Sequence, residues 1–259
     1  MLEGLLFPQK LVILPAMLVK TSAIVLHAFR YGESRLIADV FTRDEGRLSL
    51  IFNLPRTSKG KMRRHLFQPL TLLDIEVDLR PRLQLQSLRN ARLQTPFCSI
   101  PFESSKTAIT LFLAEFLYHA LKGEQRNIPL YDYIESSLEW LDSCNEHYAN
   151  FHLVFLMRLS RFLGFYPNLE NYEPGCCFDL RAGVFSTAPF SHHDILTPPE
   201  AAKLQLLMRM DYPTMHLFCM THVERQMLIG AALKYYQLHL PDFPELRSLD
   251  VLKELYRDG

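Results

Sequence analysis

The sequence lacks an apolar run long enough to cross a bilayer, and it lacks a recognisable secretory signal. Its uncharged stretches fall well short of the roughly 18 residues that a membrane span needs. The apolar stretch 1–17 is interrupted by Pro8, Gln9 and Lys10 and has no clear cleavage signal. Cysteine is scarce: the five cysteines form an odd, unpatterned set, which favours a reducing compartment over a disulfide framework. We therefore expect a protein of the cytoplasm.

Familiar catalytic and metal-binding motifs are also missing. There is no G-x-S-x-G and no H-E-x-x-H, and residues 57–61 lack the glycine spacing of a phosphate loop. A zinc site would have to combine Cys176, Cys177, His192 and His193, but adjacent cysteines do not wrap one tetrahedral ion as a C-x-x-C knuckle does. We expect no enzyme activity, no cofactor and no bound metal.

The net charge of the chain is zero, but its two halves carry net charges of opposite sign. The chain has 28 basic and 28 acidic residues. Between Lys20 and Arg92 there are fourteen Lys and Arg against seven Asp and Glu, whereas from Pro96 onward thirteen basic residues face twenty acidic ones. This asymmetry favours a front domain that binds a polyanion, joined to a domain of another kind. An uneven but merely solvated surface is the alternative.

The chain does have enough apolar residues to form hydrophobic cores. Its 259 residues are 48% hydrophobic, which excludes a disordered protein and fits one large or two modest domains. From Thr21 to Leu93 the pattern is that of strands, clearest where apolar and acidic residues alternate from Leu73 to Leu79. The expected strands are 23–29, 36–41, 48–52, 73–79 and 83–88, with a helical piece near 63–67. Five short antiparallel strands suggest a small barrel, of which the oligonucleotide-binding (OB) fold is the commonest.

Beyond Pro96 the apolar residues recur with the 3.6 period of helices. Several helix ends carry recognisable signals. These are a cap at Ser104 or Ser105, a stop at Gly123, a start at Pro129, a stop at Gly164, and capping boxes at Thr197 with Glu200 and at Thr221 with Glu224. A short last helix is expected near 249–256, and the Pro- and Gly-containing stretch 166–196 is expected to be irregular.

The front half concentrates its basic residues around a turn and the segment that follows the third strand. Arg43 and Arg47 flank the turn, and no acidic residue interrupts the chain between Gly46 and Leu73. On a barrel, such a run attracts a phosphate backbone, and an aromatic ring can add roughly 1–3 kcal/mol per stacked base. Phe52, Tyr31 and Phe41 are the rings available, although core packing competes for them. The residues expected to contact nucleic acid are Arg30, Arg35, Arg43, Arg47, Arg56, Lys59, Lys61, Arg63, Arg64 and Phe52.

Several short motifs stand in a definite order along the first two thirds of the chain. Tyr31-Gly32-Glu33-Ser34 is followed by Leu36-Ile37 and by Phe41-Thr42-Arg43, with Gly46 and Leu48 three and five positions on. Phe67-Gln68-Pro69-Leu70 precedes the fourth strand, and residues 158–165 end a helix in L-G-F. In order and spacing these motifs together resemble the bacterial RecO family of recombination mediators, over about residues 18–165 and more loosely beyond.

The resemblance implies an α+β multidomain protein. A five-stranded OB-fold barrel at residues 18–95 would be followed by an all-helical domain at 96–259 that contains the irregular insertion 166–196. It also implies a non-enzymatic role in DNA repair and recombination: binding single- and double-stranded DNA, annealing complementary strands, and helping RecR to load RecA onto DNA coated by single-strand-binding protein (SSB). The implied partners are DNA, RecR, the SSB tail and, indirectly, RecA. The implied location is the cytoplasm, at the nucleoid, with no membrane and no small-molecule substrate.

Two features depart from the family pattern. Many members carry a four-cysteine zinc module after the L-G helix, where this chain has only Cys176 and Cys177. We expect a degenerate module that keeps its shape without metal. Family chains usually begin close to the first strand, so residues 1–17 are expected to be a poorly ordered extension, with Met17 the better-fitting start.

The resemblance further implies a site for the acidic, Phe-terminated tail of SSB. Such a site needs a cation beside an apolar pocket. The helical half is net acidic, so its few basic residues stand out, and two of them lie three residues apart on one helix face. The expected cations are Lys122, Arg126, Arg158 and Arg161, with Phe116, Leu117, Phe155 and Phe162 as candidates for the pocket wall. Core packing of these rings, and arginines that snorkel from a buried helix, would give the same pattern.

Two other functions stay open. An OB-fold adaptor that binds RNA or a protein partner would show an RNA preference and no strand annealing. A hydrolase with an unrecognised site would need a nucleophile and a base, and no such pair can be named in the sequence.

Overall fold

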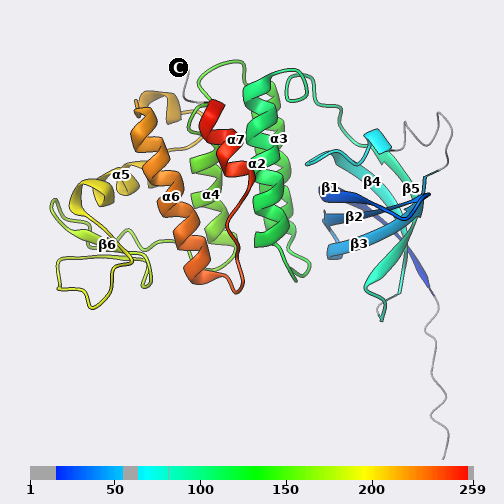
Figure 1. The fold of residues 1–259 in the computed structure, drawn as a ribbon, viewed down its shortest axis with the longest axis horizontal. Helices are drawn as coiled ribbons and strands as arrows, with labels where there is room; N and C mark the ends of the chain where they lie inside the picture. The colour runs from blue at the N-terminus through cyan, green and yellow to red at the C-terminus, as the bar shows by residue number, and fades with distance from the viewer. Residues whose placement is uncertain (1–15, 55–63, 81, 256–259) are drawn as a thin grey trace, which may run out of the picture.

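The computed structural model describes residues 16–54, 64–80 and 82–255. A β-barrel lies at one end of the molecule and a helical body at the other (Figure 1). The last helix turns back and packs against the first long helix of the helical body.

Five strands form the barrel: β1 (Met17–Tyr31), β2 (Arg35–Thr42), β3 (Gly46–Asn53), β4 (Leu72–Leu79) and β5 (Leu85–Leu93). They close on themselves in the order β1-β2-β3-β5-β4. The prediction of five strands is confirmed, but three details are wrong. The fifth strand was expected at 83–88 and is found at Leu85–Leu93. The β3–β5 pair is parallel. β1 is also longer than expected, because its first half pairs with β4 and its second half with β2.

The barrel interior is filled by alternate residues of the strands. Leu73, Ile75 and Val77 of β4 point inward and are buried. Because successive side chains of a strand point to opposite faces, the acids between them lie outside. The alternation predicted for this strand is confirmed.

The outer face of the barrel is buried in part, against the helical domain. Ile24 and Leu26 of β1 belong to the same apolar cluster as the helices. Phe41 of β2 is also in this cluster, with its ring centroid 6.2 Å from that of Tyr131 in the helical domain. The outer face of the barrel therefore contributes to the apolar core of the helical domain, while the barrel interior forms a second core of its own.

The helical domain is built mainly from helices that pack side by side (Figure 1). They are α2 (Ser104–Ala120), α3 (Ile128–Ser143), α4 (Phe151–Phe162), α5 (Pro198–Met208), α6 (His222–His239) and α7 (Ser248–Leu255), with a short 3₁₀ helix η1 (Met215–Leu217). Within the described ranges, no helix combines the length and the apolar character that crossing a membrane requires.

The two helix starts that were predicted from capping boxes are confirmed. At the start of α6, the Thr221 N–H donates to Glu224 Oε2 at 2.8 Å, and the Glu224 N–H donates to Thr221 Oγ1 at 3.2 Å. The Thr197–Glu200 capping box opens α5 in the same way. The start of α2 was predicted wrongly: its N-cap is Glu103 rather than either serine, and no side chain caps the helix there.

The segment 166–196 is not irregular throughout, contrary to the prediction. It contains a small antiparallel sheet of β6 (Cys177–Asp179), β7 (Val184–Ser186) and β8 (Ile195–Leu196), in the order β7-β6-β8. Strands of two or three residues are too short to show a period in the sequence. In the part of the chain that the structure describes, no three His, Cys, Asp or Glu side chains group to hold a metal ion.

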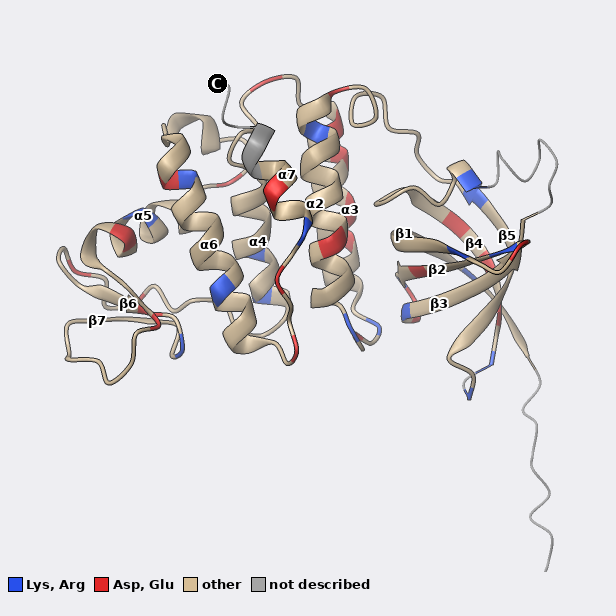
Figure 2. Cartoon of the chain, in the orientation of Figure 1, with Lys and Arg blue, Asp and Glu red and all other residues tan. Residues whose placement is uncertain are grey.

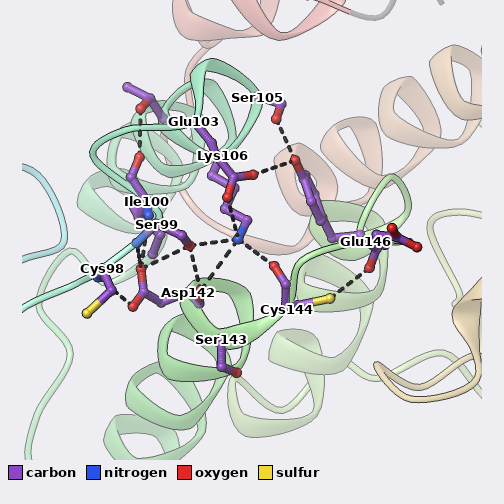
Figure 3. Close-up of polar contacts among 12 residues, drawn as sticks. Cys98, Ser99, Ile100, Glu103, Ser105, Lys106, Asp142, Ser143, Cys144 and Glu146 are labelled. Atoms are coloured by element: carbon purple, nitrogen blue, oxygen red, sulfur yellow. Dashed lines mark hydrogen bonds and ion pairs between the residues drawn. The ribbon is translucent and has the colours of Figure 1, made fainter.

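The connection between barrel and helices is fixed by Asp142 near the C-terminal end of α3 (Figure 3). Its carboxylate accepts hydrogen bonds from the backbone N–H groups of Cys98 at 2.8 Å, Ser99 at 2.8 Å and Ile100 at 2.9 Å. Burial acts to raise the pKa of Asp142, but these hydrogen bonds outweigh it and the pKa is lowered. The carboxylate thus holds the connection in place as an anion.

Lys106 of α2 is fully buried in the same network (Figure 3). Its Nζ donates to the carbonyl oxygen of Cys144 at 2.5 Å and to Ser99 Oγ at 2.7 Å, and it lies 3.3 Å from Glu103 Oε1. Because Cys144 is the C-cap of α3, the ammonium group lies at the negative end of that helix. Lys106 therefore joins the start of α2 to the end of α3.

Candidate nucleic-acid interface

One side of the barrel is electrically neutral because its cations and anions pair. The three acids on the outer face of β4 each contact a basic residue of a neighbouring strand, and Figure 2 shows both signs interspersed on the barrel. The pairs are Lys20–Glu76 at 2.8 Å, Arg89–Asp78 at 2.6 Å and Arg92–Asp74 at 3.2 Å. This ion-pair ladder uses three of the basic residues that make the front half positive, so that side is a poor match for a polyanion.

Arg43, which was predicted to contact nucleic acid, instead binds Asp132 of α3. Its Nε lies 2.9 Å from Asp132 Oδ1, and its Nη2 lies 3.3 Å from Oδ2. The hydrogen bond and charge of Asp132 raise the pKa of Arg43. A two-pronged pair of this kind orients both side chains. Arg43 therefore links the barrel to the helical domain.

Arg47, also predicted to contact nucleic acid, lies at the same interface between barrel and helical domain. Its guanidinium lies over the ring of Tyr118 in α2, 4.6 Å from the centroid, and it donates to the backbone carbonyl of the same residue. The backbone N–H of Arg47 donates to the Glu124 carbonyl at 3.0 Å. The neighbouring Gly46 has φ +72°, and a Cβ there would lie 2.5 Å from the backbone carbon of Gln125. The hairpin tip thus fits closely against the α2–α3 connection.

The other predicted cations divide into two groups. Arg30 and Arg35, beside the β1–β2 turn, are exposed, and so is Arg64, which is helical together with His65. Arg56, Lys59, Lys61 and Arg63 lie outside the described residues. The sequence interpretation missed Arg80 and Arg82, which follow β4 and are exposed.

The aromatic candidates change more. Phe52, predicted to stack on bases, is 6% exposed and packs in the barrel core with its ring centroid 4.5 Å from that of Phe67. Phe41 is buried against the helical domain. Neither ring is open to a base, so the predicted role of Phe52 is wrong.

Two rings on β1 are open to solvent: Tyr31, which was a candidate from the sequence, and Phe29, which was not. Phe29 is 41% exposed and Tyr31 is 53% exposed. They are two residues apart and so share one face of the strand, which is the outer face because Ala28, next to Phe29, packs against the barrel core. Tyr31 stands opposite Arg35 of β2, and Phe29 stands opposite Ile37. We call Phe29 and Tyr31 the β1 rings.

The four cations predicted for the SSB tail are spread over two elements. On α4, Arg158 Nη2 donates to the Met210 carbonyl at 2.9 Å, and the Arg161 guanidinium lies 4.7 Å from the ring centroid of Tyr166. Lys122 and Arg126 are exposed on the α2–α3 connection. Arg126 also lies 4.0 Å from an Asp44 oxygen of the barrel.

The predicted wall of the tail pocket is largely core. Phe116, Leu117 and Phe155 are fully buried and therefore cannot line an open pocket. Phe162 is half-buried at the end of α4, stacked on Tyr133 with ring centroids 4.9 Å apart. Of the four wall candidates, Phe162 alone keeps an accessible edge.

Comparison with known proteins adds independent evidence. The chain matches the family models described as Recombination protein O N terminal, over residues 17–97, and Recombination protein O C terminal, over residues 102–250. The DNA repair protein RecO of Phocaeicola vulgatus is 48% identical over 240 residues, and that of Bacteroides fragilis is 49% identical over 241. The RecO protein of Flavobacterium psychrophilum is 34% identical over 241 residues. Each of the three alignments covers 93% of this chain and 100% of the relative.

Proposed function

Because the chain belongs to the RecO family of DNA repair and recombination proteins, we propose that it is a non-enzymatic mediator that acts on single-stranded DNA coated by SSB. It binds single- and double-stranded DNA, anneals complementary strands and, with RecR, helps RecA to load. Its partners are then DNA, RecR and the SSB tail, with RecA an indirect one. Action on chromosomal DNA implies a place at the nucleoid in the cytoplasm.

The observation that carries the DNA-binding part is the pair of β1 rings beside exposed cations. Phe29 and Tyr31 project from a five-stranded barrel of the size of an OB fold. OB folds bind single strands with aromatic platforms and a positive groove that follows the phosphates. Arg30 and Arg35 flank the turn next to Tyr31, so phosphate contacts are within reach of the same strand.

The spacing of the β1 rings favours a strand that is already unpaired. Residues two apart on a strand are separated by about 7 Å. This is about twice the 3.4 Å rise between neighbouring bases of a duplex strand. Two adjacent bases that each lie on one ring therefore cannot stay stacked on each other. Duplex DNA would instead be held through its phosphates by the exposed arginines.

A strand on this face is also suited to annealing. Stacking on Phe29 or Tyr31 uses the flat face of a base and leaves its pairing edge free. The cations reduce the repulsion between the bound strand and an approaching complement. Both effects support annealing on the surface of one molecule.

For the SSB tail we retain the four cations, with a changed pocket. Arg158 and Arg161 flank the end of α4, where Phe162 offers a partly open ring edge. Lys122 and Arg126 on the α2–α3 connection would meet the acidic residues upstream of the terminal Phe. Binding of a fluorescent tail peptide, compared between wild type and the Arg158→Ala and Arg161→Ala variants, tests this assignment. Wild-type binding by both variants would move the tail site elsewhere.

The central experiment is annealing of complementary oligonucleotides coated with cognate SSB. Wild-type protein is expected to accelerate annealing, and the double variant Phe29→Ala/Tyr31→Ala is expected to lose most of the acceleration. Phe102→Ala is the matched control, because this ring is 82% exposed and lies in the connection before α2, away from β1. No acceleration by the wild type, together with a preference for RNA, would instead identify an OB-fold adaptor.

A further inference from the structure

A groove of about 550 Å³ lies where the barrel meets α2 and the segment that precedes α7. Its walls include His27 of β1, Tyr118 and His119 of α2, and Arg247. Pro69, Leu111, Ala114 and Pro244 supply an apolar lining. We call this space the seam groove. Its volume is within the range of pockets that hold small organic ligands, and a nucleoside is of that class.

The seam groove continues the line of the β1 rings. The ring centroids of Phe29 and His27 are 5.6 Å apart, and those of His27 and Tyr118 are 5.0 Å apart. The ring of His119 follows at 5.0 Å from that of Tyr118. A row of rings therefore runs from the exposed part of β1 across the domain boundary onto α2.

We propose that the seam groove holds the continuation of the single strand that lies on the β1 rings, so that both domains contact one DNA strand. This inference rests on the proposed function. Continuity is the reason to choose DNA over an acidic peptide. A strand that leaves Phe29 toward the helical domain meets His27 next, whereas a peptide has no such reason to use the whole row.

The charges around His119 favour an anion. Burial lowers the pKa of His119, and the positive charges of Arg47, Lys122 and His27 act in the same direction, while Glu115 opposes them. A phosphate bound here would relieve this repulsion and raise the pKa of the imidazole. Binding at this place is therefore expected to take up protons.

The carboxylate of Glu115, which lies inside the seam groove, is already hydrogen-bonded. Glu115 accepts hydrogen bonds from the backbone N–H groups of Arg247 at 3.1 Å and Ser248 at 2.8 Å, and from the Ser248 hydroxyl at 2.5 Å. Since these groups lie at the start of α7, the positive end of that helix offsets the carboxylate charge. Glu245 is the other acid on the wall, and the exposed guanidinium of Arg247 stands two residues from it.

The test compares short and long oligothymidylates by fluorescence anisotropy at several salt concentrations. An oligonucleotide of about 6 nucleotides covers little more than one OB face, whereas one of about 24 extends beyond it. Arg247→Ala should leave the short oligonucleotide unaffected and flatten the plot of log K against log salt for the long one by about 0.7, the contribution of one phosphate contact. Arg209→Ala, an exposed cation at the end of α5, should change neither.

A second measurement tests the expected proton uptake at His119 through the pH dependence of binding. When pH falls from about 7.5 to about 6, wild-type affinity for the long oligonucleotide should rise more than that of His119→Gln. Equal salt slopes for wild type and Arg247→Ala, with the Phe29→Ala/Tyr31→Ala variant weak at both lengths, would overturn this inference alone. Full binding by that double variant at both lengths would overturn the proposed DNA face as well. The inference would also be overturned if Arg247→Ala weakened binding of an acidic peptide but left binding of the long oligonucleotide unchanged.

Discussion

The ammonium group of Lys106 lies 2.5 Å from the carbonyl oxygen of Cys144, and the side chain of this lysine is fully buried. A buried cation is tolerated only where it is paired and hydrogen-bonded. Here the end of α3 supplies the carbonyl, and Glu103 supplies the opposite charge at 3.3 Å. The start of α2 and the end of α3 are therefore held together by charge at the point where the barrel connection enters.

Replacing Lys106 by Met should lower the free energy of unfolding by about 1–3 kcal/mol, because the Cys144 carbonyl and the Ser99 hydroxyl lose their buried donor. Lys203→Met is the control. Lys203 pairs with Glu224 on the surface at 2.6 Å, and loss of that pair should cost about 1 kcal/mol or less. Urea denaturation of both variants measures the difference, and equal losses would contradict the role assigned to Lys106.

Gly46→Ala should disrupt the contact between barrel and helices. The positive φ costs an alanine about 1–2 kcal/mol, and overlap with the backbone of residues 124–126 adds a similar amount. Gly123→Ala isolates the first effect, since Gly123 has φ +80° and a Cβ there would meet nothing within 4 Å. Thermal unfolding should therefore rank wild type, Gly123→Ala and Gly46→Ala in decreasing stability. If the two variants unfold alike, the hairpin tip is not tightly packed.

Arg35 and Arg43 should separate DNA binding from domain contact. Arg35→Ala should flatten the salt dependence of single-strand binding by about 0.7, whereas Arg43→Ala should leave it unchanged. Arg43 is bound to Asp132, so its loss should instead reduce stability, and only slightly, because the pair is exposed to solvent. A flattened salt dependence with Arg43→Ala would return this residue to the DNA face.

His152 predicts a specific loss of stability in acid. Burial, and then the charge of Arg225, lower its pKa from 6.5 to about 3. Below pH 6.5 the imidazole of His152 is protonated in the unfolded chain but stays neutral in the folded chain. The stabilisation is thus complete above pH 6.5 and is lost as the pH falls toward 3, at up to about 1.4 kcal/mol per pH unit.

The measurement is the free energy of unfolding between about pH 7 and pH 5. His152→Gln should show a shallower slope than wild type, whatever its stability at neutral pH. His193→Gln, at an exposed position, should keep the wild-type slope. A slope that does not change with His152→Gln would show that this imidazole is not kept neutral by the fold.

The features predicted well from the sequence depend on neighbours along the chain. Alternation in β4 and the capping boxes at Thr197 and Thr221 need only residues within a few positions, and these predictions are confirmed. The role of Arg43 depends on Asp132, 89 residues away, and no local pattern contains that contact. The charge asymmetry correctly marked the barrel as basic in sequence, but it could not show that β4 neutralises one side.

Of the two exposed rings, Tyr31 was among those considered from the sequence, whereas Phe29 was not, for a local reason. A register irregularity between Val25 and His27 shifts which residues of β1 face outward. Strict alternation counted from Val25 places Phe29 inside the barrel, whereas the structure exposes it. The family resemblance indicated a role in DNA repair, and the geometry changed which side chains we propose for DNA contact.

The ion-pair ladder on β4 also has a consequence for kinetics. Because Asp74, Glu76 and Asp78 offset the cations next to them, the positive charge of the barrel is unevenly distributed. An uneven electrostatic field orients the molecule relative to a polyanion before contact, so productive encounters become more frequent. This orientation acts over about one Debye length, roughly 8 Å at physiological salt. In the proposed function, the acids on β4 thus help to orient the proposed DNA face toward an approaching strand.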